Sequence, residues 1–281
     1  MITIGLTTWS EHQSLLANHP QPLTLTEYAA FFPTVEVDTT FYALPQAQTI
    51  RNWQAAVPAT FQFIFKAPQE LTTHNGVLSS SALKTSMATF ITCLRPLLVS
   101  HQVKTILFQF PPYFTATSEN YIYLQRLRQL APSLPIAVEF RHESWLTGPQ
   151  KTQTVTICHQ LHYTLVAADE PHHLPGSVPF VLAQTTPNLI LIRLHGRNAV
   201  GWGNRSPEWR KKRTLYRYSD QELTNLARLI RKYQTAAQEF CVIFNNNSGG
   251  DAAPNAQALQ SKLQLHFDNL APKPPEQTDL F

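Results

Sequence analysis

The sequence predicts an α/β protein built as a single (β/α)8 barrel of the TIM type, irregular between its sixth and seventh strands. Eight short runs rich in β-branched and aromatic residues recur along the 281 residues. Several of these runs are followed by segments with the period of an amphipathic helix. We find no internal repeat, and alternating strands and helices over this length are typical of a closed parallel barrel. A doubly wound sheet is the alternative.

The eight expected strands cover residues 2–9, 34–42, 61–67, 105–110, 136–141, 163–169, 189–196 and 240–246. Helices are expected between them where a capping residue, or a proline in the first turn, precedes a helical period: Thr24 with Glu27, Ser80, Ser118, Ser219 with Glu222, and Pro254. The segment 170–188 is the exception, because it holds four prolines and no helical period.

Composition indicates a soluble globular protein. The chain is 43% hydrophobic and 14% charged, and it has no apolar run of membrane-spanning length. It opens on "MITIGLTTWS" without the pattern of a secretory signal, and its cysteines, Cys93, Cys158 and Cys241, are far apart. We therefore expect a cytoplasmic protein with no membrane association, no disulfide framework and no structural zinc cluster.

Polar residues share one face of the expected strands. In "VEVDTTFY", Val35 and Val37 facing the helices would turn Glu36 and Asp38 into the lumen, because residues two apart lie on one face. In the sixth strand, Val166 facing outward turns Asp169 inward. The same alternation in the other strands predicts that further side chains point into the lumen: Trp9, Lys66, Gln109, Glu139, Arg141, Arg193 and His195. In the eighth strand the alternation does not decide which of Asn245 and Asn246 points inward.

These residues come late in their strands, at the end of a barrel where active sites form. Unpaired charges in a dry core cost several kcal/mol, so they must be paired, hydrated or bound to a ligand. Mutual pairing would give a network that only organises the barrel. The convergence of His74, His195, Gln109 and Trp9 on the same mouth favours a functional pocket instead.

Several ordered motifs carry a resemblance to a known family. The segments "VEVDTTFYALP", "NWQAAVP", "FQFIFKAP" with "LTTHN", "FQFPPYF", "VEFRHESW", "IRLHGR", "LYRYSDQEL" and "FNNNSGGDAAPNA" together resemble the YecE-like family, domain of unknown function 72, over roughly residues 2–267. The resemblance implies a TIM-type barrel whose mouth these segments build, but it supplies no reaction. A remote likeness of the family to barrels of the endonuclease IV and xylose isomerase type suggests nucleic-acid or phosphodiester chemistry. Asp38 departs from the asparagine expected in many relatives, so Glu36 is the better candidate for a required carboxylate.

The residue types at the mouth suit anion binding and proton transfer. Lys66, Arg141 and Arg193 offer donors for a phosphate or carboxylate. Candidate general acids and bases are Glu36, Glu139, Asp169, His74 and His195, which could also hold a divalent metal. A metal cofactor is not favoured, because no H-x-x-E or H-E-x-x-H spacing occurs and the nearby cations repel one.

A basic, aromatic segment follows the seventh strand. Its candidate nucleic-acid contacts are Trp202, Arg210, Lys211, Lys212 and Arg213. Aromatic platforms beside cations suit stacked bases and phosphates. The alternatives are a solvated loop whose aromatic residues pack on the rim, or a lid over a small ligand.

The last residues, 271–281, are expected to form a flexible proline-rich tail beyond a barrel domain of residues 1–270. The tail ends in "QTDLF", in which Gln277, Asp279, Leu280 and Phe281 match the Q-L-[SD]-L-F peptide that docks bacterial repair proteins on the DNA sliding clamp. Thr278 replaces the usual leucine, and apolar ends can also fold back on the barrel.

The leading hypothesis is a DNA-associated protein that binds phosphate or nucleic acid at the mouth, or a hydrolase of phosphodiesters, docked on the sliding clamp through its tail. The alternative is an enzyme acting on a small phosphorylated or acidic sugar. A non-catalytic clamp adaptor is a third option.

Overall fold

The barrel expected from the sequence is confirmed in the computed structural model, which describes residues 1–16, 21–171, 174, 177–202 and 212–274. Nine strands form one sheet in the order β6-β5-β4-β3-β2-β1-β9-β8-β7, and all of its paired strands are parallel. The strands are β1 Ile2–Thr7, β2 Thr34–Val37, β3 Gln62–Lys66, β4 Val103–Gln109, β5 Ile136–Glu139, β6 Tyr163–Leu165, β7 Ala167–Asp169, β8 Leu189–Leu194 and β9 Glu239–Phe244.

The two edge strands of this sheet are halves of the expected sixth strand. β6 pairs with β5 and β7 pairs with β8, and Val166 alone separates them. The Val166 amide donates to the Val138 carbonyl (2.9 Å), which continues the ladder across the break. β6 and β7 therefore count as one strand, so the nine strands correspond to an eight-stranded barrel that closes at Val166.

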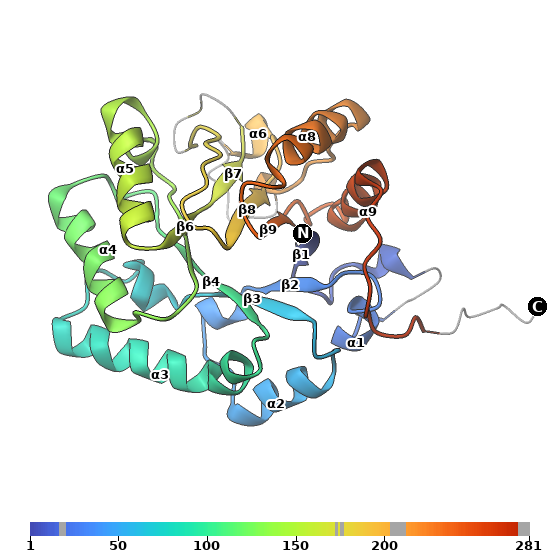
Figure 1. The fold of residues 1–281 in the computed structure, drawn as a ribbon, viewed down its shortest axis with the longest axis horizontal. Coiled ribbons are helices and arrows are strands. Elements are labelled where there is room, and N and C mark those ends of the chain that lie inside the picture. Colours follow the sequence, from blue (N-terminus) through green and yellow to red (C-terminus); the bar gives the residue numbers. More distant parts are fainter. Residues whose placement is uncertain (17–20, 172–173, 175–176, 203–211, 275–281) are drawn as a thin grey trace, which may run out of the picture.

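Helices surround the strands (Figure 1). They are α1 Leu25–Tyr28, α2 Ala47–Ala55, α3 Ser80–Val99, α4 Ser118–Leu130, α5 Gly148–Gln160, α6 Ala199–Trp202, α8 Asp220–Tyr233 and α9 Ala252–Leu263, with 3₁₀ turns at Gln13–Leu15, Thr39–Phe41, Gln69–Thr72 and Glu143–Trp145. The expected capping boxes of Thr24 with Glu27 and of Ser219 with Glu222 both form. Between β7 and β8 the described residues contain no helix, as the prolines predict.

By length and composition alone α3 could cross a membrane. In the structure it is one of the helices around the barrel, and one face of it packs inward through Leu83, Met87, Phe90, Leu94 and Leu97.

Buried apolar residues form two clusters. The larger lies between strands and helices, and the smaller consists of Ile64, Leu107, Ala137, Val166, Leu189, Leu191, Cys241 and Ile243 from the strands themselves and the β6–β7 junction. The smaller cluster fills the barrel interior. It therefore fixes which residues of each strand point inward, because every second residue shares a face.

After α9 the chain returns along the outside of the barrel. The Ala271 amide donates to the Ala29 carbonyl (3.0 Å), and the Lys273 ammonium lies 5.9 Å from the centre of the Phe31 ring. The residues that match the clamp-binding peptide lie outside the described residues; they are Gln277, Asp279, Leu280 and Phe281.

Candidate functional site

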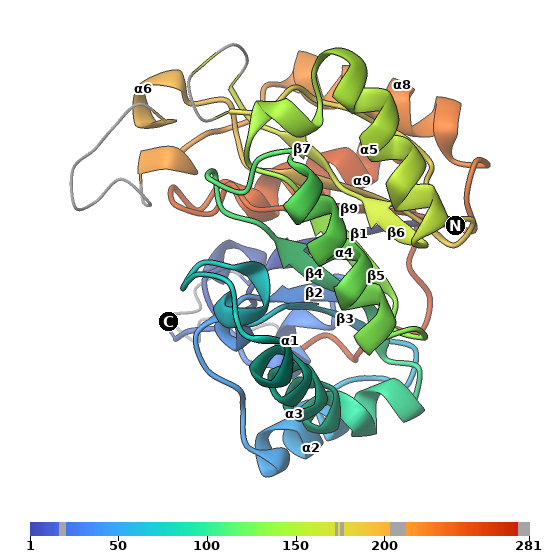
Figure 2. The same cartoon turned by 90° about the vertical axis from the view of Figure 1, so that its left-hand side faces the viewer.

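A cavity of about 1010 Å³ opens at the carboxyl ends of the strands. This end of the barrel lies at the left of Figure 2, on the side of α6 and opposite the N-terminus. The cavity wall contains ten of the residues expected there from the sequence, which are Asp38, Lys66, His74, Gln109, Arg141, Arg193, His195, Trp202, Arg213 and Asn245.

Arg193 forms the floor of the cavity. Its Nε donates to Glu36 Oε2 (2.8 Å), its Nη2 donates to Glu36 Oε1, and its Nη1 donates to Glu139 Oε2 (2.5 Å). All three residues are 0% exposed. Glu36 and Glu139 do not line the cavity, and both pair with Arg193, so this guanidinium neutralises two buried carboxylates.

Glu139 is the centre of a second set of contacts. Its Oε1 accepts from Gln109 (2.7 Å) and from Arg141 Nη1 (2.9 Å), and lies 3.1 Å from His195 Nε2. Asn245 Nδ2 donates to the other ring nitrogen of His195 (2.8 Å). This pattern fits a neutral imidazole with its proton on Nε2, and burial lowers the pKa of His195 to about 3, with Arg193 adding to the effect.

The two buried glutamates titrate differently. Burial raises the pKa of Glu36 to about 7, against the attraction of Arg193. Burial would also raise the pKa of Glu139, but Arg193, His195 and Arg141 outweigh it and hold that pKa well below its usual range. Glu139 therefore stays ionised at neutral pH, whereas the pKa of Glu36 lies near neutrality.

Two arginines and a tryptophan form one wall of the cavity. Arg213 Cζ lies 3.4 Å from the centre of the Trp202 ring, and Arg141 Cζ lies 5.1 Å from it. Arg141 Nη1 also forms an ion pair with Glu170 Oε2 (3.0 Å), and burial raises the pKa of this carboxyl to about 7. Burial, with the repulsion of Arg141, lowers the pKa of Arg213 to about 9. The two guanidiniums are therefore close enough to oppose each other's charge.

The opposite wall comes from the ends of β2 and β3. Lys66 Nζ lies 4.6 Å from the centre of the Phe41 ring, and the His74 ring meets the same phenyl ring edge-on at 4.8 Å. The Thr72 hydroxyl lies 2.8 Å from His74 Nδ1. Asp38 lines this wall, and its Oδ1 is buried with no hydrogen-bond partner among the described residues.

The prediction that Asp169 faces the lumen is wrong. The inner cluster contains Val166, so the phase of this strand is the reverse of the expected one and Asp169 points outward. There it binds Arg197 at 2.8 to 3.1 Å and accepts from the Tyr218 hydroxyl (2.6 Å). Glu170, which sequence reasoning missed, turns inward to Arg141 in its place.

Two other expectations need correction. Thr8 has φ 61°, and after this turn Trp9 lies edge-on against Trp53 (5.5 Å between ring centres) and outside the cavity wall. Asn245 points inward, whereas Asn246 is buried on the other side, where it donates to the Tyr216 carbonyl (2.8 Å) and to Asn255 (2.9 Å).

The basic segment is only partly described. Lys212 is exposed and does not line the cavity, in contrast to Arg213. Arg210 and Lys211 lie outside the described residues. Within the described part of the chain, no three His, Cys, Asp or Glu side chains are grouped so that they could hold a metal ion.

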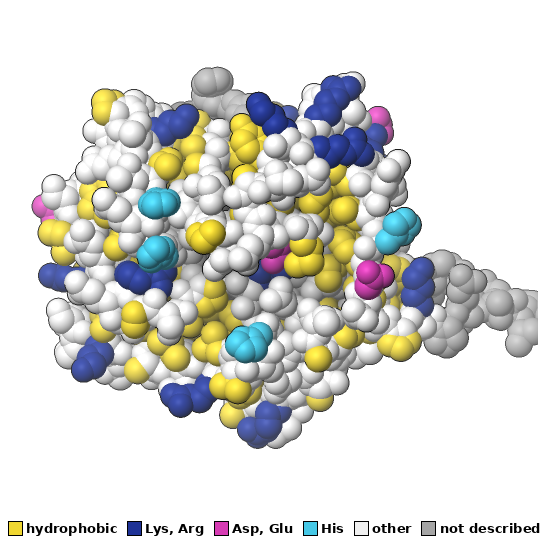
Figure 3. Space-filling model, in the orientation of Figure 1, with side chains coloured by type: hydrophobic (Ala, Val, Ile, Leu, Met, Phe, Trp, Pro, Cys, Tyr) yellow, Lys and Arg dark blue, Asp and Glu magenta, His cyan; other side chains and the backbone are white. Residues whose placement is uncertain are grey.

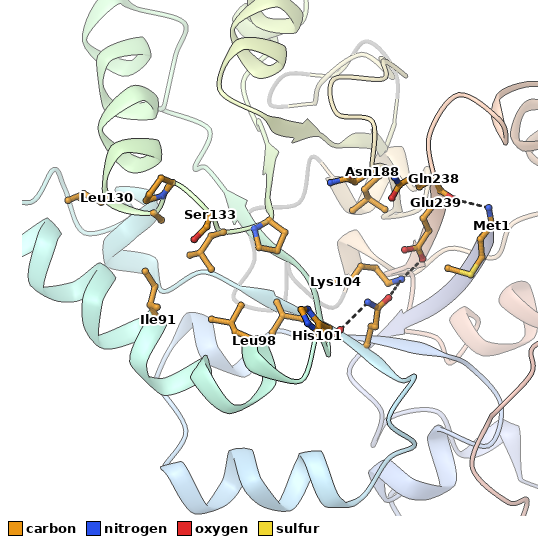
Figure 4. A pocket seen from close by; sticks show the side chains of 17 residues that line it. Met1, Ile91, Leu98, His101, Lys104, Leu130, Ser133, Asn188, Gln238 and Glu239 are labelled. Carbon is orange, nitrogen blue, oxygen red and sulfur yellow. Dashed lines mark hydrogen bonds and ion pairs between the residues drawn. The ribbon is translucent and has the colours of Figure 1, made fainter.

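A second hollow, of about 810 Å³, lies at the amino-terminal end of the barrel. Figure 3 shows this end, with lysine and arginine side chains mostly towards its edge and hydrophobic side chains between them. In Figure 4, Lys104 is paired with Glu239 and donates to Gln62 (2.9 Å), and the Met1 amine donates to Gln238 (2.8 Å). Lys104 and Glu239 neutralise each other here, as is typical of the end of a barrel that serves stability.

The comparisons with known proteins agree with the family resemblance read from the motifs. The model of the family "Protein of unknown function DUF72" matches residues 3–279. The UPF0759 protein YunF of Bacillus subtilis is 38% identical over 285 residues, with full coverage of both chains, and YecE of Escherichia coli is 29% identical over 164 residues, which cover 55% of this chain and 54% of that one.

Solved structures of the same family superpose on nearly the whole chain. A DUF72 protein of Enterococcus faecalis matches with a TM-score of 0.90 and 40% identity, over 98% of this chain and 99% of that one. One from Thermotoga maritima matches with a TM-score of 0.79 and 28% identity, over 94% and 100%. The chain belongs to the DUF72 family.

Proposed function

We propose that the mouth of the barrel binds a ligand through a phosphate group, and that this ligand is a nucleotide unit of nucleic acid. The observation that carries the proposal is the pair of guanidiniums of Arg141 and Arg213 on the Trp202 ring. The charge of Arg141 opposes that of Arg213, and a phosphate that both contact would turn the repulsion into two favourable interactions.

The carboxylates near the two arginines leave Arg141 able to bind a phosphate. Glu139 and Glu170 each contact Arg141 through its Nη1, which leaves other N–H groups of the guanidinium to meet a ligand. Glu36 and Glu139 do not line the cavity, and both are paired with Arg193. A phosphate in the cavity would thus meet guanidiniums first.

Aromatic side chains favour a ligand with flat rings. Besides Trp202, the wall includes Phe41, Tyr42 and Tyr113, and both tyrosines are 60% exposed. The Tyr113 hydroxyl donates to the backbone of Thr73 and His74 (3.0 and 2.9 Å), which holds the ring at the rim. Rings fixed beside cations are the elements of single-stranded nucleic-acid sites.

A phosphorylated sugar is the second candidate. The Arg193 network closes the cavity from below, and its volume of about 1010 Å³ is close to the upper end of the range for small-molecule sites. Hydrolysis of a phosphodiester needs proton-transfer groups that face the ligand. Because Glu36 and Glu139 do not line the cavity, and His195 has a partner at both nitrogens, we assign these three to the floor. His74 remains on the wall, and we limit the proposal to binding.

We also propose that the tail brings the barrel to DNA by docking on the sliding clamp through Gln277, Asp279, Leu280 and Phe281. The support is the sequence match alone, at the end of a proline-rich spacer. The proposal for the mouth does not depend on it.

The test is isothermal titration calorimetry with a short 5′-phosphorylated oligouridylate and, separately, with ribose 5-phosphate. Arg213→Gln should weaken binding by about tenfold to a hundredfold, as expected for a lost charge-assisted hydrogen bond. Arg217→Gln is the matched control, because this arginine lies four residues further on and is 75% exposed. Thermal melting would show that both variants fold.

Three results would be informative. Loss of oligonucleotide binding in Arg213→Gln alone supports the nucleic-acid proposal. Tight binding of the sugar phosphate with none of the oligonucleotide supports the second candidate. Equal effects of the two variants, or no binding of any phosphate compound at low salt, would contradict the proposal.

A further inference from the structure

We infer that the cavity holds a second subsite, formed by Asp38, Lys66 and His74, which binds hydroxyl groups, so that the ligand is the phosphate ester of a hydroxyl-bearing sugar. The inference rests on the proposed function for the phosphate end of the ligand. The second subsite would contact the end of the ligand opposite its phosphate, and so would set the direction in which the ligand lies in the cavity.

The position of this subsite follows from the strand order. Asp38 and Lys66 follow β2 and end β3, whereas Arg141 follows β5 and Trp202 follows β8. In the closed sheet, β4 separates the two groups on one side, and β1 and β9 separate them on the other. A ligand lying across Arg193 would therefore meet the arginine pair at one end and Asp38 at the other.

Asp38 provides the observation that points to a ligand. Its Oδ1 is buried, it has no hydrogen-bond partner among the described residues, and the side chain lines the cavity. A buried acceptor without a donor is unfavourable, so nearly all such groups are satisfied in folded proteins. A hydroxyl group of a bound ligand would supply the missing proton donor.

The two neighbours of Asp38 fit the same class of ligand. Lys66 forms no ion pair with a described residue, and its ammonium can donate to a hydroxyl oxygen. Burial and Lys66 lower the pKa of His74 to about 4, so its imidazole is neutral at physiological pH and can exchange hydrogen bonds with a hydroxyl. A second phosphate fits less well, because Asp38 would repel it.

The experiment compares inorganic phosphate, adenosine, AMP and 2′,3′-dideoxy-AMP by calorimetry on the full chain. In the native protein, AMP should bind about tenfold more tightly than its dideoxy analogue, since the analogue leaves Asp38 without a donor. Asp38→Ala should reduce this ratio to about one and leave the binding of inorganic phosphate unchanged. Asp38→Asn, which keeps an acceptor oxygen, should restore part of the ratio.

Glu11→Ala is the matched control, because Glu11 is another carboxylate of the cavity wall and contacts Asn247 instead. The inference is overturned if AMP and its dideoxy analogue bind equally to the native protein, or if Asp38→Ala leaves their ratio intact. If phosphate fails to bind but adenosine binds in a manner that depends on Asp38, the proposed function fails and the subsite stands. If neither binds, both fail.

Discussion

Replacing Arg193 by methionine tests the assignment of the cavity floor. The substitution keeps the length of the aliphatic chain but removes the charge that neutralises Glu36 and Glu139, both 0% exposed. Removing one partner of a buried ion pair costs about 3–5 kcal/mol, because it leaves an uncompensated charge. Since Arg193 serves two carboxylates, we expect a loss in the free energy of unfolding at the upper end of that range, measured by urea denaturation near neutral pH.

The pH dependence makes this prediction specific. Without Arg193 the pKa values of Glu36 and Glu139 rise, so the folded variant takes up protons that the unfolded chain does not. Its deficit should shrink as the pH falls from about 8 to about 5.5. Arg217→Met, an exposed arginine, should change stability by less than about 0.5 kcal/mol at either pH. A deficit for Arg193→Met below about 1 kcal/mol, or one independent of pH, would refute the reasoning.

Three further changes test other parts of the account. As the pH rises from about 5 to about 8, the Glu36→Gln variant should gain up to about 3 kcal/mol of stability relative to the native protein. The reason is that the raised pKa of Glu36, about 7, makes its ionised side chain unfavourable in the folded state. Parallel pH profiles of the two proteins in urea denaturation would contradict this. Tyr218→Phe removes the hydroxyl that donates to Asp169 and accepts from the Gly196 amide. The free energy of unfolding should fall by about 1–3 kcal/mol, with no change in ligand binding at the mouth. Weaker ligand binding in this variant would show that Asp169 contributes to the site after all. Deleting residues 277–281 should abolish capture of the protein by immobilised sliding clamp, and capture that survives the deletion would exclude the peptide.

The sequence predicts the barrel well because eight β-rich runs and their capping residues are local signals. It also predicts that polar groups meet at the carboxyl ends of the strands. Every second side chain of a strand points to the same side, and in a parallel barrel all the carboxyl ends lie at one end. The phase of the sixth strand is harder to predict. Both faces of "YTLVAAD" are apolar, so the pattern does not show that Val166 belongs inside, and the error exchanges Asp169 for Glu170.

The sequence also does not predict which of the polar residues at the mouth form the floor of the cavity and which form its walls. This division depends on which carboxylates Arg193 reaches from β8, and those are set by the closure of the barrel rather than by spacing in the chain. Trp9 leaves the site because Thr8 adopts a left-handed backbone conformation that β-branched residues rarely take. No local pattern in the sequence indicates that turn.

The most direct test of the central claim is a crystal structure of the protein with a 5′-phosphorylated dinucleotide. The account predicts that the 5′-phosphate lies within about 3 Å of the guanidinium nitrogens of both Arg141 and Arg213, above the Arg193 floor. A phosphate bound away from this pair, for instance at Lys104 in the hollow at the amino-terminal end, would contradict it.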